Sequence, residues 1–303
     1  MFEQISSNKR RSVLLVAGFV VLAMALAWAV QILFGFGVGG LLIALVVVGG
    51  GSVLAWYKSD AVALAMSHAR LTTPESEPRL HNLVEGLCIA AGLPKPRVYL
   101  VDDPAPNAFA TGRNPQHAAI AVTTGLMEKL SRIELEGVLA HELSHIKNYD
   151  VLVSTLAVTF VGVIALVADF SLRFMWWGGP RHRDDTRAGG GGPAAAFAIV
   201  GFILLLVAPL VAKVMQATIS RRREVLADVS GVALTRYPPG LISALEKLRD
   251  DTTVVHSSSR ATAHLWVESP LARTPEEGRL SRLNRLFDTH PPLEDRIQAL
   301  KEL

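Results

Sequence analysis

Cysteine is nearly absent from this chain. Cys88 is the only one, so no disulfide can form within the chain and nothing in it calls for an oxidising compartment. A strong net charge is also absent, since the formal value is +3 at pH 7. The basic residues form short clusters beside apolar runs, such as Lys9–Arg11 and Arg221–Arg223. Such clusters are typical of membrane-flanking segments, so we expect a lipid bilayer as a partner and no nucleic acid.

Charged residues are missing from one long stretch near the start. The 45 residues from Ser12 to Trp56 contain no Asp, Glu, Lys or Arg. That run is too long for one membrane span of about 20 residues and fits two, with the glycine-rich segment 35–40 as the turn. Ala25-Leu26-Ala27 has the small residues of a signal-peptide cleavage site. A second apolar span follows at once, however, which favours two retained spans.

Two further apolar runs, Val151–Ala168 and Ala194–Ala212, lack charged residues, and the loop 173–193 between them carries four arginines and a glycine run. The chain is therefore predicted to be a mainly α integral membrane protein with four transmembrane helices. The spans are predicted at about 12–34, 38–57, 151–172 and 194–214, which gives hairpins within 1–57 and 151–217.

The two polar sections, 58–150 and 218–303, carry the signals of helices and short strands. Apolar residues at helical spacing predict helices over 78–91, ended by Gly92, and over 222–234, 239–248 and 291–303. Short apolar runs predict strands at 97–101, 107–112 and 118–122. Residues 251–285 show no steady periodicity and are predicted to be a loop-rich insertion. Together the two sections predict one discontinuous, zincin-like α+β catalytic domain with a small sheet.

The residues 141–145 read His-Glu-Leu-Ser-His. Ser131 and Glu134 form a capping-box pattern before an apolar stripe, so the motif is predicted to lie on a helix. His141 and His145, four residues apart, then share a face and can bind one Zn²⁺ ion, while Glu142 can reach a water molecule on that metal as general base. A chance H-E-x-x-H is rare in a chain of this composition, at about one in a hundred.

A catalytic zinc needs a third protein ligand and leaves a fourth position to water. Glu224 follows Arg221–Arg223 on the helix predicted to emerge from the fourth span, and Asp228 lies one turn later on the same face. Asp228 can fix the tautomer of a ligand imidazole. From spacing alone, an exposed acidic pair on a charged helix fits these two residues equally well.

At this point the sequence resembles a known family, the HtpX-type membrane zinc metallopeptidases, which are relatives of the CAAX prenyl endopeptidases among the gluzincins. The resemblance covers nearly the whole chain and rests on four motifs in order. They are Asn107-Ala108-Phe109-Ala110-Thr111-Gly112, the segment from His141 to Asp150, the segment from Arg221 to Asp228, and Thr289 to Arg296. The resemblance implies one zinc per chain with Glu224 as third ligand. It also implies quality control of membrane proteins at a bacterial inner membrane, with a cytoplasmic catalytic domain.

Three further assignments follow for such a protease. Residues 107–112 are predicted to be an edge strand that pairs with an extended, unfolded substrate, and an ordinary internal strand is the alternative. His290 is a candidate oxyanion donor or displaceable ligand, and a helix cap is the equal alternative. Glu136 and Asp150 beside the motif are interpreted as structural.

The basic clusters also predict the topology. Lys9–Arg11, Lys58 and Arg221–Arg223 fall on one side after even numbers of crossings, so both termini and both catalytic sections are expected inside. The four arginines of loop 173–193 count against this arrangement. The alternative function is a non-catalytic membrane scaffold with a structural zinc, but such a site is closed by four protein ligands and has no use for Glu142.

Overall fold

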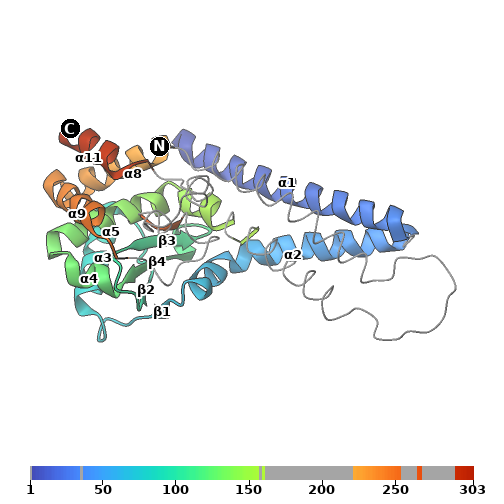
Figure 1. The fold of residues 1–303 in the computed structure, drawn as a ribbon, viewed down its shortest axis with the longest axis horizontal. Helices are drawn as coiled ribbons and strands as arrows, with labels where there is room; N and C mark the ends of the chain where they lie inside the picture. The colour runs from blue at the N-terminus through green and yellow to red at the C-terminus, as the bar shows by residue number, and fades with distance from the viewer. Residues whose placement is uncertain (1, 35–36, 157–158, 161–220, 254–264, 268–290) are drawn as a thin grey trace.

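A long helical hairpin opens the chain and projects to one side of the rest (Figure 1). In this computed structural model, the described residues are 2–34, 37–156, 159–160, 221–253, 265–267 and 291–303. Helix α1 (Phe2–Phe34) runs out along the hairpin and α2 (Gly37–Met66) runs back. Residues 37–40 of the predicted turn are helical, and residues 35–36 lie outside the described residues. Both helices extend beyond the predicted spans, because their ends pack on the domain, where Asn8, Ala63 and Leu64 are buried.

The structure describes only part of the second predicted hairpin. Residues 150–156 and 159–160 are helical, and Leu152, Leu156 and Phe160 pack against α1. The remainder of the third span, the loop 173–193 and the fourth span lie outside the described residues. Within the part of the chain that the structure describes, no helix combines the length and hydropathy needed to cross a membrane. The four predicted spans stay a prediction.

The sheet has four strands in the order β1-β2-β4-β3. The strands are β1 (Arg70–Leu71), β2 (Arg97–Val101), β3 (Ala108–Gly112) and β4 (Ala118–Thr123). Strand β4 is central, parallel to β2 and antiparallel to β3. Between β3 and β4 lies the short helix η1 (Pro115–His117). The sequence predicts strands at 97–101, 107–112 and 118–122, and β2, β3 and β4 confirm them within one residue at each end, whereas β1 was not predicted.

Helices cover the sheet because its strands are apolar on both faces. Ala108, Ala110 and Ile120 belong to the main core with Leu139 and Leu143 of the helix α5 (Arg132–Lys147). The alternate residues of the same strands, such as Phe109 and Ala121, point to the opposite face, as the two-residue period of a strand requires. There they meet the end of α2 and the buried Trp266.

The remaining helices surround α5. They are α3 (Pro78–Ala91), α4 (Thr124–Lys129), α8 (Arg221–Thr235), α9 (Pro238–Asp250) and α11 (Leu293–Lys301). The two predicted helix boundaries, the end of α3 and the start of α5, are confirmed. Gly92 ends α3 in the left-handed conformation (φ 66°), and Ser131 with Glu134 forms the capping box that starts α5. Chain segments from both polar sections thus pack together on the H-E-x-x-H helix (Figure 1).

Candidate metal centre

Helix α5 presents both histidines of the motif on one face, as their spacing predicts. The Nε2 atoms of His141 and His145 lie 3.1 Å apart, and the rings meet edge to face. His141 is almost fully buried, with 1% of its surface exposed, while the side chain of His145 retains 14% exposure. The centre is therefore enclosed on the His141 side and open to solvent on the His145 side.

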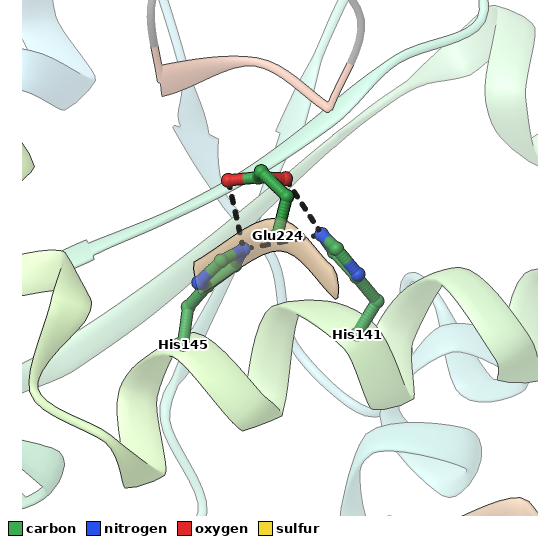
Figure 2. A group of neighbouring side chains, drawn as sticks. All are labelled: His141, His145 and Glu224. Atoms are coloured by element: carbon green, nitrogen blue, oxygen red, sulfur yellow. Dashed lines mark hydrogen bonds and ion pairs between the residues drawn. The ribbon is translucent and has the colours of Figure 1, made fainter. Parts of the chain in front are cut away.

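The carboxylate of Glu224 completes the group from helix α8 (Figure 2). Its Oε2 atom lies 3.6 Å from Nε2 of His141, and its Oε1 atom lies 3.7 Å from Nε2 of His145. His141, His145 and Glu224 are the group of potential metal ligands found among the described residues. The candidate third ligand is thus brought to the two histidines from 79 residues further along the chain.

The donor set fits a zinc ion. Tetrahedral zinc with bonds of about 2.0–2.1 Å holds its ligand atoms about 3.3 Å apart. The three distances here, 3.1, 3.6 and 3.7 Å, lie around that value. Moreover, the Nδ1 atom of each imidazole faces a carboxylate, which can only accept a hydrogen bond. When neutral, with their protons on Nδ1, the two rings would direct both Nε2 lone pairs at the Glu224 carboxylate, an arrangement that a bound cation would stabilise.

One face of α8 forms this contact with α5. Glu224, Ala227, Asp228 and Gly231 recur at the spacing of a helical face. A Cβ atom on Gly231 would lie 3.0 Å from the backbone nitrogen of His141, a tight contact that would push the two helices apart by a few tenths of an ångström. The close approach at Gly231 brings Glu224, two turns earlier, within reach of both imidazoles.

Asp228 contacts Nδ1 of His141. Its Oδ1 atom lies 2.8 Å from Nδ1 of His141, and Arg296 of α11 donates from Nε and Nη2 to the same carboxylate at 2.9 and 2.6 Å. Burial disfavours the charged Asp228, but Arg296 and His141 outweigh it and lower its pKa to about 2. Burial and Arg296 oppose the protonation of His141, yet Asp228 and Glu224 raise the pKa of His141 to about 9. A more basic imidazole is a better metal ligand.

Asp150 plays the same part for His145, although the sequence favoured a structural role. Its Oδ2 atom accepts a hydrogen bond from Nδ1 of His145 at 3.2 Å. Burial lowers the pKa of His145, but the negative charges of Glu224 and Asp150 reverse this and raise it. Arg296 is the second residue that sequence reasoning did not assign. It lies within the fourth motif, but no local signal links it to Asp228, 68 residues earlier.

Glu142 follows His141 on α5 and is 3% exposed. Its negative charge acts on Arg296: burial opposes the positive charge of this guanidinium, but Asp228, Glu224 and Glu142 together raise its pKa. The carboxylates around the metal position are thus balanced by a buried cation. His290, the candidate oxyanion donor, lies outside the described residues.

Among the described residues, strand β3 lies at one edge of the sheet and β1 at the other. It begins at Ala108, while the side chain of Asn107 accepts a hydrogen bond from the Ala108 N–H. Its outer edge is partly occupied: Val267 donates its N–H to the carbonyl of Ala108 at 2.9 Å, and the N–H of Gly112 donates to Thr155 Oγ1. Ala110, between them, presents its backbone groups to the same edge because alternate residues do so.

Comparisons with known proteins agree with this geometry. The family profile described as Peptidase family M48 matches residues 74–303. Proteins named "Protease HtpX homolog" match over the full length of this chain. Those of Listeria monocytogenes serotype 4a and Limosilactobacillus fermentum are 42% and 44% identical, with 100% of each relative covered. That of Thermoanaerobacter pseudethanolicus is 40% identical, with 98% covered.

A solved structure has the same fold. The crystal structure of S. mikatae Ste24p is similar to 99% of this chain with a TM-score of 0.51 and 19% sequence identity, and 67% of that protein is covered. The fold is therefore Ste24-like, mainly helical with a small mixed sheet. With the family profile covering most of the chain and full-length relatives above 40% identity, the chain belongs to peptidase family M48 as an HtpX-type zinc metallopeptidase.

Proposed function

We propose that this metallopeptidase is a membrane-bound endopeptidase that hydrolyses misfolded or damaged membrane proteins, with His141, His145 and Glu224 as its zinc ligands. The convergence of these three side chains, with Glu142 next to His141, carries the proposal. Three protein ligands leave one coordination position of a tetrahedral ion for water, which is the composition of a catalytic rather than a structural site.

Each residue then has a chemical task. A bound zinc ion supplies Lewis acidity, which polarises the peptide carbonyl and lowers the pKa of water to about 7. Glu142 takes the proton of the attacking water as general base and delivers it to the leaving amine as general acid. Asp228 and Asp150 hold the two imidazoles with Nε2 directed at the metal position. His290 is proposed as a further donor to the oxyanion, because it belongs to the fourth motif.

The substrate is proposed to pair as an extended strand with the segment of Asn107, Ala108, Phe109, Ala110, Thr111 and Gly112. Support comes from the edge position of β3 and from its packing against α5, which carries the motif. Within the segment, Ala110 offers backbone groups to the outer edge, whereas Ala108 and Gly112 already bind Val267 and Thr155. Main-chain pairing is nearly blind to sequence, which suits unfolded substrates.

A bacterial inner-membrane location, with both termini and the catalytic domain in the cytoplasm, is proposed from the sequence. It rests on the four apolar runs, the basic clusters and the joint packing of sections 58–150 and 218–303 around α5. Exposed apolar side chains on the hairpin support a lipid partner. They include Val21, Trp28, Leu42, Val46 and Leu54, each 59–73% exposed.

Replacing Glu142 with Gln tests the proposal. The variant should retain zinc and fold, because the ligands survive, but it should lose hydrolysis of unfolded casein, because the base is gone. Glu136→Gln, on the same helix but outside the centre, is the matched control and should cleave casein like the wild type. Comparable cleavage by Glu142→Gln and the wild type would contradict the proposed mechanism. In parallel, Glu224→Ala should lose zinc, since two imidazoles alone bind it weakly.

A further inference from the structure

We infer that Asn8, in the first helix of the chain, is a positioning residue of the metal centre. It acts by holding Asp150 against His145. Asn8 is 3% exposed, whereas its neighbours Lys9 and Arg10 are exposed. A buried amide requires partners, and those of Asn8 lie 140 and 142 residues away, in the turn that follows the H-E-x-x-H helix.

That turn has an unfavourable backbone. Helix α5 ends at Lys147, Asn148 caps it, and Tyr149 adopts φ 60°, the left-handed conformation. For a residue with a side chain this conformation is unfavourable, so surrounding contacts must hold it. The reversal at Tyr149 is what turns Asp150 back towards His145, since the chain becomes helical again at Asp150.

Asn8 binds on both sides of Tyr149. Its Nδ2 group donates to the carbonyl of Asn148 at 2.8 Å and to Oδ1 of Asp150 at 2.7 Å. An amide group carries two hydrogens, so both are used in this bridge. Lys9 adds a second contact from α1, with its ammonium 4.7 Å from the ring centre of Tyr149. The first turns of α1 thus brace the turn that positions Asp150.

The bridge fixes the direction of the Asp150 carboxylate. Oδ1 is held by Asn8, with Arg223 Nη1 at a longer 3.5 Å, which leaves Oδ2 to accept from Nδ1 of His145 at 3.2 Å. Arg223 supplies the compensating charge, whereas neutral Asn8 supplies geometry. Without the amide, the carboxylate is free to rotate towards Arg223 and away from His145, which loosens the orientation of the imidazole.

The inference rests on the proposed role of His145 as a zinc ligand, and zinc retention tests it independently of catalysis. Full-length Asn8→Ala should release zinc to a chelator about tenfold faster than the wild type. This factor is at the lower end of the range that is usual when a residue supporting a metal ligand is removed. Cobalt-substituted protein should show a shifted d–d absorption spectrum, and kcat should fall with little change in KM. Ser6→Ala, on the exposed side of the same turn of α1, should behave as wild type.

A double-mutant cycle separates positioning from general damage to the fold. If Asn8 acts through Asp150, Asn8→Ala should add nothing to the zinc release of Asp150→Ala. If Asn8→Ala does not fold, Asn8→Ser, which keeps one donor, replaces it. The inference would be overturned if the Asn8 variant released zinc at the wild-type rate and kept the wild-type cobalt spectrum. It would also be overturned if Asn8→Ala had the same effect in the wild type and in the Asp150→Ala variant. Continued hydrolysis by Glu142→Gln would instead overturn the proposed function and leave this result unaffected.

Discussion

Nδ1 of His141 and Oδ1 of Asp228 lie 2.8 Å apart across the interface of α5 and α8. The contact joins a candidate ligand from one polar section of the chain to a carboxylate from the other, and Arg296 from the last helix neutralises that carboxylate. Three chain segments therefore converge behind one imidazole. The metal centre depends on the correct packing of these segments. Substitutions of residues that are not metal ligands should therefore change the zinc affinity and the geometry of the centre.

Asp228→Ala should weaken zinc binding about 10–100-fold, because His141 loses the acceptor that fixes its tautomer. The variant also leaves Arg296 buried without its carboxylate, which lowers stability. The double variant Asp228→Ala with Arg296→Met removes the buried pair together. It should recover melting temperature but not zinc affinity. Metal titration and thermal unfolding check both parts, and unchanged zinc affinity in a folded Asp228→Ala protein would contradict the role.

Gly231→Ala should lower zinc affinity and hydrolysis, although alanine is the better helix former. The added Cβ would lie 3.0 Å from the backbone nitrogen and 3.2 Å from the Cα atom of His141, so α8 must move away and carry Glu224 with it. Gly86→Ala is the control: it lies in α3 with nothing within 4 Å of its Cβ position, and should gain up to about 1 kcal/mol. Equal behaviour of the two variants in zinc titration would refute the close-packing account.

The capping box of α5 predicts a pH dependence of stability. Burial alone would raise the pKa of Glu134, but hydrogen bonds from Lys247, Ser243 and Ser131 outweigh it and lower the pKa to about 2, from 4.5. Because the folded value is the lower one, the unfolded chain binds the proton more readily. The stabilisation by Glu134 is therefore fully present above about pH 4.5 and is lost as the pH falls towards 2.

Glu134→Gln measures this contribution. The variant should unfold more easily than the wild type at pH 7, by about 1–3 kcal/mol for a hydrogen-bonded charge, and the difference should shrink between pH 4.5 and 2. Glu246→Gln, which breaks an exposed ion pair with Lys301, is the control and should change stability little at any pH. A Glu134→Gln difference that grew on acidification would show that the sign is wrong.

Reporter fusions after residue 60, after residue 185 and at the C-terminus should read inside, outside and inside. The arginines of loop 173–193 make this a real test of the proposed topology. If residue 60 and the C-terminus lay on opposite faces, a hydrocarbon layer about 30 Å thick would separate His141 from Glu224. The side chains of these two residues lie 3.6 Å apart in the fold.

Much of the fold could be predicted because its signals are local. Gly92, Ser131 with Glu134, and the short apolar runs of strands 97–101 and 118–122 each act over a few residues. The pairing of His141 and His145 is also a local signal, because one helical turn sets the relative position of their side chains. Glu224 needed the family resemblance, because its spacing fits an exposed acidic pair equally well.

The supporting residues of the site could not be predicted in this way. Asp150 faces His145 only because Tyr149 adopts φ 60°, a conformation that a tyrosine rarely takes and that no pattern signals. Arg296 and Asn8 reach the centre from the last and first helices, more than 140 residues from their partners His141 and Asp150. Such contacts come from tertiary packing, which a reading of neighbouring residues does not contain.

X-ray absorption of the zinc-loaded wild-type protein tests whether the metal has three protein ligands and a water molecule. We expect four-coordinate zinc with two imidazoles, one carboxylate and one exchangeable oxygen, at about 2.0–2.1 Å. A peptide hydroxamate should replace that oxygen and alter the spectrum, while Glu224→Ala should retain too little zinc to give one. A zinc ion closed by four protein ligands and indifferent to the hydroxamate would contradict the account and favour the structural site of a non-catalytic scaffold.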